Sequence, residues 1–259
     1  MAKKKAEKKA EVTTEAPKEE KRRKRPGPAN RRPSSKRHAE NLTKVDKKKR
    51  YALDEAISIL QDCKKTKFDE TVEVSMKLGI DPRKSDQLVR GSVSLPKGTG
   101  KSVTILVFAE GDIAKQAEEA GADYVGSSEY ADKIQKEGWL DFDMVIAHPS
   151  MMRHVGKLGK ILGPKGKMPS PKSGTVTPNV GQAVKEFKAG KVEFRSDSGG
   201  NVLAPLGRLS FASEDLVANA TAFIEHIRNI RPSTAKGTYM EKVCISSSMG
   251  PGLMIDTGK

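Results

Sequence analysis

Long hydrophobic runs are missing from this sequence. No stretch approaches the roughly 20 apolar residues that a membrane-spanning helix needs, and no hydrophobic segment stands near the N-terminus. We therefore expect neither a membrane span nor a secretory signal. Cysteine is scarce as well: Cys63 and Cys244 lie far apart and form no metal-ligand spacing, which argues against a disulfide framework and a metal site. We expect both to be reduced, half-buried residues of a cytoplasmic protein.

The positive charge of the chain is concentrated near its N-terminus. Residues 1–50 hold 20 Lys and Arg against 7 Asp and Glu, whereas the other 209 residues hold 28 against 26. Because it has almost no apolar residues, segment 1–42 is predicted to be a disordered basic extension. Such a tail either binds polyanions without recognising their sequence or only keeps the protein soluble, and its composition is compatible with both roles. Five glutamates from Glu7 to Glu20 argue against an organelle transit peptide and favour a bacterial-type protein.

The first hydrophobic pattern after the extension is that of an α+β unit. Apolar residues recur at helical spacing from Leu53 to Leu60 and then alternate with polar residues in TVEVSMKLGI, which predicts a helix and a half-buried strand. LVRGSVSL predicts a second strand. The same α+β pattern returns from Lys191, where KVEFRS and NVLAPLG are predicted to form a hairpin. A long amphipathic helix begins at Ser213 and ends before Pro232, and TYMEKVCISSS is the predicted final strand.

A different pattern lies between these segments. VTILVFA, ADYVG and DMVIAHP are typical of buried strands, and helices separate them, the first with Asp112 as its predicted N-cap. This alternation predicts a parallel α/β layer of roughly residues 99–189, inserted into the α+β unit. Both crossings fall at glycines, Gly98 and Gly190, and glycine tolerates the backbone changes that a hinge requires.

The stretch LPKGTGKSV, residues 95–103, ends like a phosphate-binding loop. That motif needs a glycine where Leu95 stands, and it opens a helix, whereas here a strand follows. The other catalytic patterns are also missing: His148 and His154 lack a nearby carboxylate or cysteine, and His226 lies in an amphipathic helix. We therefore predict a protein that is not an enzyme, with no catalytic residue, cofactor or metal. A nucleotide site in the inserted layer remains the rival hypothesis.

Three segments suggest contact with nucleic acid. From Met144 to Lys185 there is no Asp or Glu, and this basic stretch includes GKLGKILGPKGKMPSPKSGTV. A Gly/Pro-rich loop of one charge sign suits a phosphate backbone, although a merely solvated loop would look the same. In KFDETVEVSMK, Phe68 could stack on a base or pack in the core. The hydroxyls and glycine of ISSSMGPG suit contacts with 2′-OH and phosphate groups.

Taken together, these segments resemble a known family. FDETVEVSMKLGIDPRKSDQLVRGSVSLPKGTGK, EEAGADYVG, GKLGKILGPKGKMPSPKSGTV, KAGKVEFRSD and SSSMGPG occur in the order typical of the large-subunit ribosomal protein L-one family, from about Val45 to Ile255. The resemblance is to a bacterial-type member with a basic N-terminal extension. It implies a discontinuous α+β domain from both chain ends, residues 43–97 and 191–259. It also implies an inserted Rossmann-like three-layer α/β domain, residues 98–190.

The resemblance also implies a function. Members of the family are non-enzymatic constituents of the large ribosomal subunit in the cytoplasm. Their discontinuous domain binds large-subunit rRNA at the mobile side stalk, which assists release of deacylated tRNA from the exit site, and many bacterial members repress translation of their own operon. The implied partners are rRNA, exit-site tRNA, the protein's own mRNA leader and other large-subunit components, and no membrane.

Matching the family motifs gives candidate residues in this sequence. The RNA-binding candidates are Lys67, Phe68, Thr71, Glu73, Lys77, Arg195, Asp197, Ser248, Met249 and Gly250, and the hinge candidates are Gly98 and Gly190. Two motifs depart from the family pattern. Ser248 replaces Thr in the usual TMGP but keeps the hydroxyl, and Ser170 replaces Asn in the usual PNPK, which puts the contacts of that loop in doubt. We expect the extension to add affinity and salt sensitivity but little selectivity.

Overall fold

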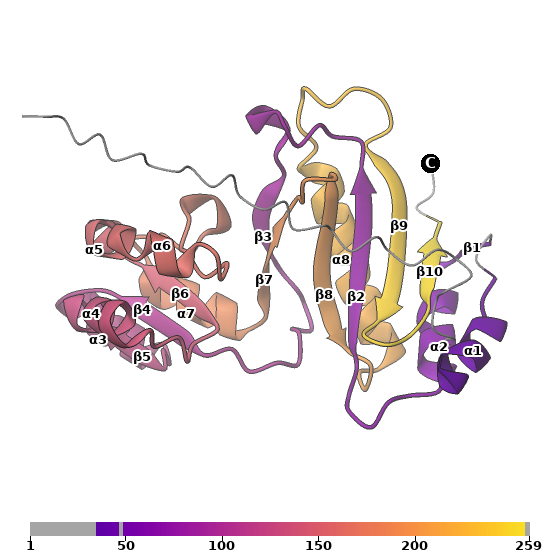
Figure 1. The fold of residues 1–259 in the computed structure, drawn as a ribbon, viewed down its shortest axis with the longest axis horizontal. Helices are drawn as coiled ribbons and strands as arrows, with labels where there is room; N and C mark the ends of the chain where they lie inside the picture. The colour runs from indigo at the N-terminus through magenta and orange to yellow at the C-terminus, as the bar shows by residue number, and fades with distance from the viewer. Residues whose placement is uncertain (1–34, 47–48, 257–259) are drawn as a thin grey trace, which may run out of the picture. The chain divides into compact units, whose positions relative to one another are not determined.

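Strands from both ends of the chain pair in one five-stranded sheet. The computed structural model describes residues 35–46 and 49–256, which belong to one compact unit. The sheet has the order β1-β10-β9-β2-β8, with β2 between β9 and β8 (Figure 1). β1 and β10 are parallel, and the other neighbours are antiparallel. The strands are β1 (Arg50–Tyr51), β2 (Thr71–Leu78), β8 (Asn201–Arg208), β9 (Met240–Ser247) and β10 (Gly252–Ile255).

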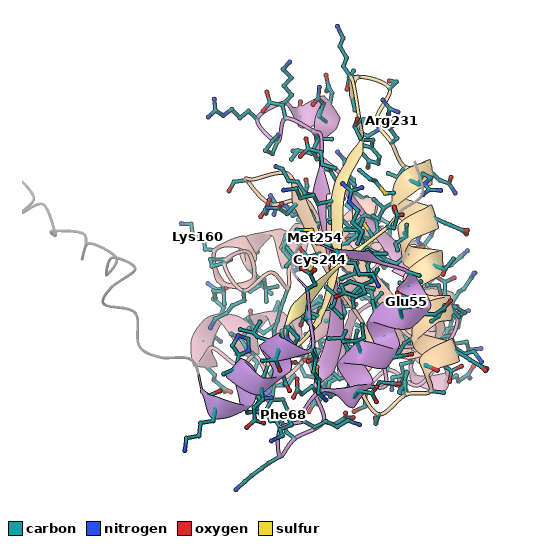
Figure 2. All side chains as sticks on the ribbon, turned by 90° about the vertical axis from the view of Figure 1, so that its right-hand side faces the viewer. Glu55, Phe68, Lys160, Arg231, Cys244 and Met254 are labelled. Carbon is teal, nitrogen blue, oxygen red and sulfur yellow. The ribbon has the colours of Figure 1, made fainter. Side chains whose placement is uncertain are left out.

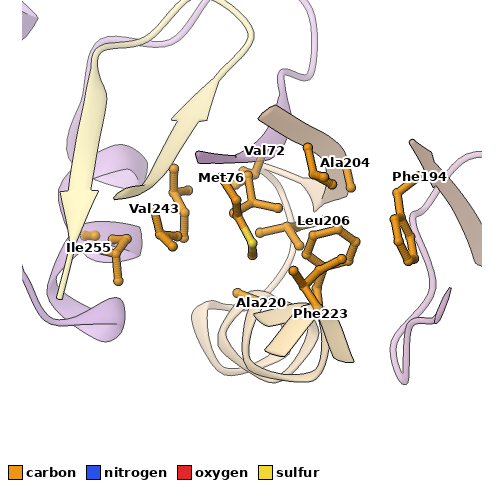
Figure 3. Packing of buried hydrophobic residues seen from close by; sticks show 14 of the residues in the cluster. Val72, Met76, Phe194, Ala204, Leu206, Ala220, Phe223, Val243 and Ile255 are labelled. Carbon is orange, nitrogen blue, oxygen red and sulfur yellow. The ribbon is translucent and has the colours of Figure 1, made fainter. Parts of the chain in front are cut away.

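One face of this sheet is buried under two helices. The four apolar residues of β2 are at most 1% exposed, so the predicted strand and its alternation are confirmed. Helices α2 (Leu53–Asp62) and α8 (Ser213–Asn229) form as predicted and pack on that face. Figure 3 shows Phe223 of α8 near Leu206 and Met76 of the sheet. The polar residues of β2 therefore lie on the opposite, open face.

A second, parallel sheet carries the inserted layer. Its strands are β4 (Ile105–Phe108), β5 (Tyr124–Gly126) and β6 (Met144–Ala147), in the order β5-β4-β6. Leu106 packs in one hydrophobic cluster with α4, and its neighbour Val107 packs in another with α7 on the other face. Helices on both faces make three layers, which confirms the predicted fold class. The helices are α3 (Asp112–Glu119), α4 (Ser128–Glu137), α5 (Met152–Lys157), α6 (Gly159–Leu162) and α7 (Val180–Lys188).

The predicted hairpin of KVEFRS and NVLAPLG is wrong. β7 (Lys191–Arg195) pairs with β3 (Arg90–Ser94) in a two-stranded sheet, whereas β8 pairs with β2. A tight turn does join them, because Asp197 N donates to Asn201 O at 2.8 Å, but only the bridge between Ser196 and Val202 links the two strands. Each strand instead pairs along its length with a strand far away in the sequence, so tertiary pairing overrides the local one.

Three further expectations need correction. Helix α1 (Lys36–Thr43) begins inside segment 1–42 and ends one residue beyond it, so the prediction of disorder is wrong for residues 35–42, and the rest of that segment lies outside the described residues. The first part of GKLGKILGPKGK forms the end of helix α5 and the whole of α6 rather than a loop. Asp112 is the first residue of α3, and the N-cap is Gly111. Short 3-10 turns η2 (Ser85–Gln87), η3 (Pro149–Met151) and η4 (Pro171–Ser173) complete the described elements.

The two chain crossings lie against each other. Gly98 and Gly190 have φ of 66° and 109°, and a Cβ added to Gly190 would lie 2.4 Å from Gly98 Cα. Asn219 of α8, fully buried, fixes the first crossing: it accepts from Lys97 N at 3.0 Å and donates to Gly98 O at 2.9 Å. Only glycine fits such a close approach with this backbone. The domain bounds at residues 42, 97 and 190, and a hinge between them, remain predictions.

Candidate nucleic-acid interface

Two loops meet at the start of β2 and present exposed side chains of mixed chemistry. They are residues 66–71, which lead into the strand, and residues 247–250, which join β9 to β10; together they are called the rim. Six of the sequence candidates lie in these loops and a seventh, Glu73, is two residues away. Sequence segments separated by some 180 residues are thus brought together.

A pair of reciprocal hydrogen bonds joins the two loops. Ser248 N donates to Thr71 O at 3.0 Å, and Thr71 N donates to Ser248 Oγ at 3.1 Å. The Thr71 hydroxyl also accepts from the Arg208 guanidinium at 3.3 Å, which leaves its own proton free to be donated outward. The Ser248 side chain therefore has a structural task at the rim in addition to any contact with a ligand.

Glu70, which sequence reasoning missed, is the centre of the rim. Its carboxylate is 2% exposed and accepts from Ser247 Oγ at 2.7 Å, Met249 N at 3.1 Å and Thr66 N at 3.1 Å. Burial opposes its ionised form, but these hydrogen bonds outweigh burial and lower the pKa of Glu70. The signal in the sequence was weak: a carboxylate next to a strand is usually a solvated residue, and only its distant partners reveal the burial.

Exposed apolar side chains stand beside this polar centre. Phe68 is 56% exposed and Met249 is 53% exposed, both well above what a packed core residue allows. Phe68 therefore does not pack in the core, which was one of the two readings of its motif; Figure 2 shows it at the outer edge of the molecule. Gly250 lies tightly packed behind Met249, because a Cβ there would be 2.3 Å from Ser247 Oγ. The exposed Lys67 adds positive charge.

The open face of the five-stranded sheet continues the rim. Glu73 lies opposite Ser246 of β9 on one side and Pro205 of β8 on the other. The next row runs from Met254 through Cys244 and Ser75 to Leu203, and both end residues are exposed. This face thus offers a hydroxyl, a carboxylate and exposed apolar side chains, a mixture suited to base edges and 2′-OH groups.

Lys77 and Asp197 form a separate cluster at the far end of β2. Six residues of strand place Lys77 roughly 20 Å from Thr71. Lys77 Nζ donates to Gly199 O, and the Asp197 carboxylate accepts from Gly199 N at 2.8 Å and Asn201 N at 2.7 Å. Hydrogen bonds from Asn201 hold the pKa of Asp197 below its usual value. Asp197 is therefore occupied in a turn, which sequence matching alone did not show.

Arg195 does not join either cluster. It lies on β7, directly opposite Arg90 of β3, and both residues line a cavity of about 570 Å³ together with loop residues 163–171. Like charges in register repel each other. The structure thus brings Arg195 near the basic stretch of the inserted layer rather than near Phe68.

Most cations of that basic stretch point to solvent. Arg153, Lys157, Lys160, Lys165, Lys172 and Lys185 are exposed, and Figure 2 marks Lys160 on the surface. Lys167 differs: its Nζ donates to Leu140 O at 3.2 Å and to Phe142 O, and it lies 5.0 Å from the centre of the Phe142 ring. Lys167 therefore holds two loops together instead of offering charge to a ligand.

Other kinds of site find no support among residues 35–46 and 49–256. No group of three or more His, Cys, Asp and Glu side chains could hold a metal ion there. Within the same residues, no helix is long and apolar enough to span a membrane. Cys63 is buried and Cys244 half-buried, both with free thiols, and burial raises the pKa of each.

Comparison with known proteins identifies the family of the chain. The model of the ribosomal protein L1p/L10e family matches residues 60–251 of the chain. The chain is also 56% identical, over 222 residues, to the large ribosomal subunit protein uL1 of Protochlamydia amoebophila (strain UWE25). That alignment covers 86% of this chain and 94% of its relative.

Proposed function

Because the chain belongs to the ribosomal protein L1p/L10e family, and is thus a structural constituent of the large ribosomal subunit, we propose that its rim binds folded rRNA of the side stalk. The family assignment places the protein with the large subunit in the cytoplasm. Because this family consists of structural RNA-binding proteins, we also propose that the chain is not an enzyme.

The observation that carries the proposal is the combination of groups at the rim. An exposed aromatic ring, an exposed thioether and acceptor groups lie within one surface that hydrogen bonds hold in place. Phe68 can stack on an unstacked base, and Glu73 can accept from a 2′-OH or a guanine N–H group. Unlike a cluster of lysines, such a surface distinguishes one folded RNA from another.

The test is binding of the full chain to a stalk-rRNA fragment and to a scrambled RNA of equal length. Both are measured over a salt series. We expect the stalk fragment to bind more tightly, with a ratio that persists as salt weakens both affinities. Equal affinities for the two RNAs, with equal salt slopes, would mean that the protein binds RNA through nonspecific electrostatic attraction alone, and this would contradict the proposal.

A second part of the proposal concerns tRNA. Five exposed cations, Arg153, Lys157, Lys160, Lys165 and Lys172, follow one another in segment 153–172, outside the rim, and we propose that they form a polyanion-binding surface. With the inserted layer hinged at Gly98 and Gly190, this surface would follow deacylated tRNA as it leaves the exit site. Single-molecule distances between a dye near Lys160 and one near Glu55 test the hinge: two or more interconverting distances are expected. A single fixed distance overturns it.

Repression of the protein's own operon is a further proposal. The rim is one surface, so stalk rRNA and an mRNA leader with a similar fold would compete for it. We expect the leader RNA to be displaced by the stalk fragment at equimolar amounts, and a leader-controlled reporter to fall when the protein is in excess. A leader that binds without competition would point to a different site and contradict this mechanism.

A further inference from the structure

Helix α1 reaches the rim with a single arginine. Arg37 Nη1 donates to Lys64 O at 3.1 Å, Nη2 donates to Met249 O at 3.3 Å, and Nη1 lies 3.5 Å from Glu70 Oε1. The guanidinium thus contacts both loops of the rim and the buried carboxylate that joins them. A planar group with five donors suits this three-way contact better than a flexible ammonium does.

A second residue of α1 fixes the helix in place. Asn41 is fully buried, accepts from Lys64 N at 2.9 Å and donates to Lys64 O at 3.2 Å. Both backbone groups of Lys64 are therefore satisfied by α1. Arg37 and Asn41, four residues apart, lie on the same side of the helix, so this side is docked on the loop that leads to Phe68.

Removal of Arg37 would leave Glu70 less well held. The carboxylate is almost completely shielded from water, and a shielded charge is costly unless it is paired and hydrogen-bonded. Its remaining donors are Ser247, Met249 N and Thr66 N, all of them within the two loops. If the hydrogen bonds of Glu70 weaken, the backbone of the two loops that carry Met249 and Phe68 therefore becomes less well ordered.

We propose that helix α1 is a positioning element of the RNA-binding rim, and that it acts through Arg37 and Glu70 to fix the Met249 turn against the Phe68 loop. This inference rests on the proposed function of the rim. It assigns the end of the basic extension to selectivity for a folded RNA, whereas the sequence alone suggested that the extension adds only charge.

The decisive comparison is between two neutralising substitutions on neighbouring residues of α1. Arg37→Gln and Lys36→Gln each remove one positive charge from the full chain, but among the described residues Lys36 makes no side-chain hydrogen bond or ion pair. Simple charge predicts equal losses on any RNA. We expect Arg37→Gln to lower the preference for the stalk fragment over scrambled RNA by about tenfold, and Lys36→Gln to leave it unchanged.

Glu70→Gln gives a test of opposite sign. This substitution makes the protein more positive, so electrostatics alone predicts tighter binding to both RNAs. Positioning predicts weaker binding to the stalk fragment, because a glutamine cannot accept from Thr66 N, Ser247 and Met249 N while also facing Arg37. Circular dichroism and thermal unfolding show whether the variant is folded; if it is not, the Arg37 and Lys36 pair still decides.

Hydrogen exchange at the Met249 and Ser248 amides measures the order of this turn in the absence of RNA. We expect faster exchange there in Arg37→Gln than in Lys36→Gln. Equal exchange and equal RNA preference in the two variants would overturn the inference while leaving the rim as the binding site. If the unaltered protein shows no preference for the stalk fragment, the proposed function fails, and the exchange data still decide whether Arg37 orders the rim.

Discussion

Ser248 and Thr71 donate hydrogen bonds to each other, backbone to backbone in one direction and backbone to side chain in the other. The distances are 3.0 Å from Ser248 N to Thr71 O and 3.1 Å from Thr71 N to Ser248 Oγ. The pair continues the ladder between β2 and β9 by one step after the strand has turned away. It ties the only two loops in the described part of the chain that present both a hydroxyl and an exposed Phe or Met.

Ser248→Ala should loosen this connection. The Thr71 N–H loses its acceptor, and we expect stalk-RNA binding to weaken by about 0.5–1.5 kcal/mol. Amide exchange at Thr71 should also become faster, whereas Ser248→Thr should behave like the unaltered protein because the hydroxyl is retained. Titration of RNA with each variant checks the affinity. Unchanged binding in Ser248→Ala would show that the backbone bond alone holds the turn.

Phe68→Ala should separate binding from folding. The ring is 56% exposed, so its loss should leave the unfolding temperature nearly unchanged. If the ring stacks on a base, RNA binding should weaken by about 1–3 kcal/mol. Leu88→Ala is the matched control, since Leu88 is also exposed but lies beyond the far end of β2. Equal effects of the two variants on RNA affinity would exclude stacking.

Gly190→Ala should destabilise the chain crossing. The new Cβ would combine a φ of 109° with a position 2.4 Å from Gly98 Cα, and we expect a loss of about 3 kcal/mol or more in the free energy of unfolding. Gly138→Ala is the control, with a φ of 66° and no atom within 4 Å of the added Cβ. It should lose only about 1–2 kcal/mol. Urea unfolding of both variants measures the difference, and equal losses would mean that the crossing relaxes freely.

Glu70 should make stability depend on pH in the acid range. Its hydrogen bonds lower its pKa in the folded protein, so the stabilisation is complete above the unfolded value of about 4.3. It is lost as pH falls from there through the lower folded value. We therefore expect the unaltered protein to exceed Glu70→Gln in stability at pH 7, with the difference shrinking on acidification below about pH 4.3. Parallel stability curves down to pH 3 would contradict this linkage.

Local pattern was sufficient where one face of an element is buried. The alternation in β2, the continuous apolar run of β4 and the helical spacing in α8 each gave the correct element from neighbouring residues alone. The rim residues Phe68 and Met249 could also be predicted, because each of them lies inside an unbroken sequence motif of the family.

Long-range partners could not be read from the sequence. β7 and β8 look like a hairpin, yet β3 and β2 are their partners. Helix α1 has no apolar stripe from which it could be predicted. Arg37 and Asn41 hold it instead, through hydrogen bonds to a loop more than 20 residues later in the sequence. The buried Glu70 carboxylate accepts hydrogen bonds from Ser247 and Met249, which lie some 180 residues later, so no local pattern predicts its role.

The strand order of the five-stranded sheet also determines the stage of chain synthesis at which the rim can form. β2 lies between β8 and β9, and the Met249 turn follows β9, so this strand cannot pair until the ribosome has synthesised partners that come more than 100 residues later. A growing chain can thus complete the three-layered part while its RNA-binding surface is still absent. If the rim binds rRNA or the protein's own mRNA, as proposed, it can do so only after β9 and the Met249 turn have been synthesised, and the proposed control of synthesis would respond only to chains that have passed this point.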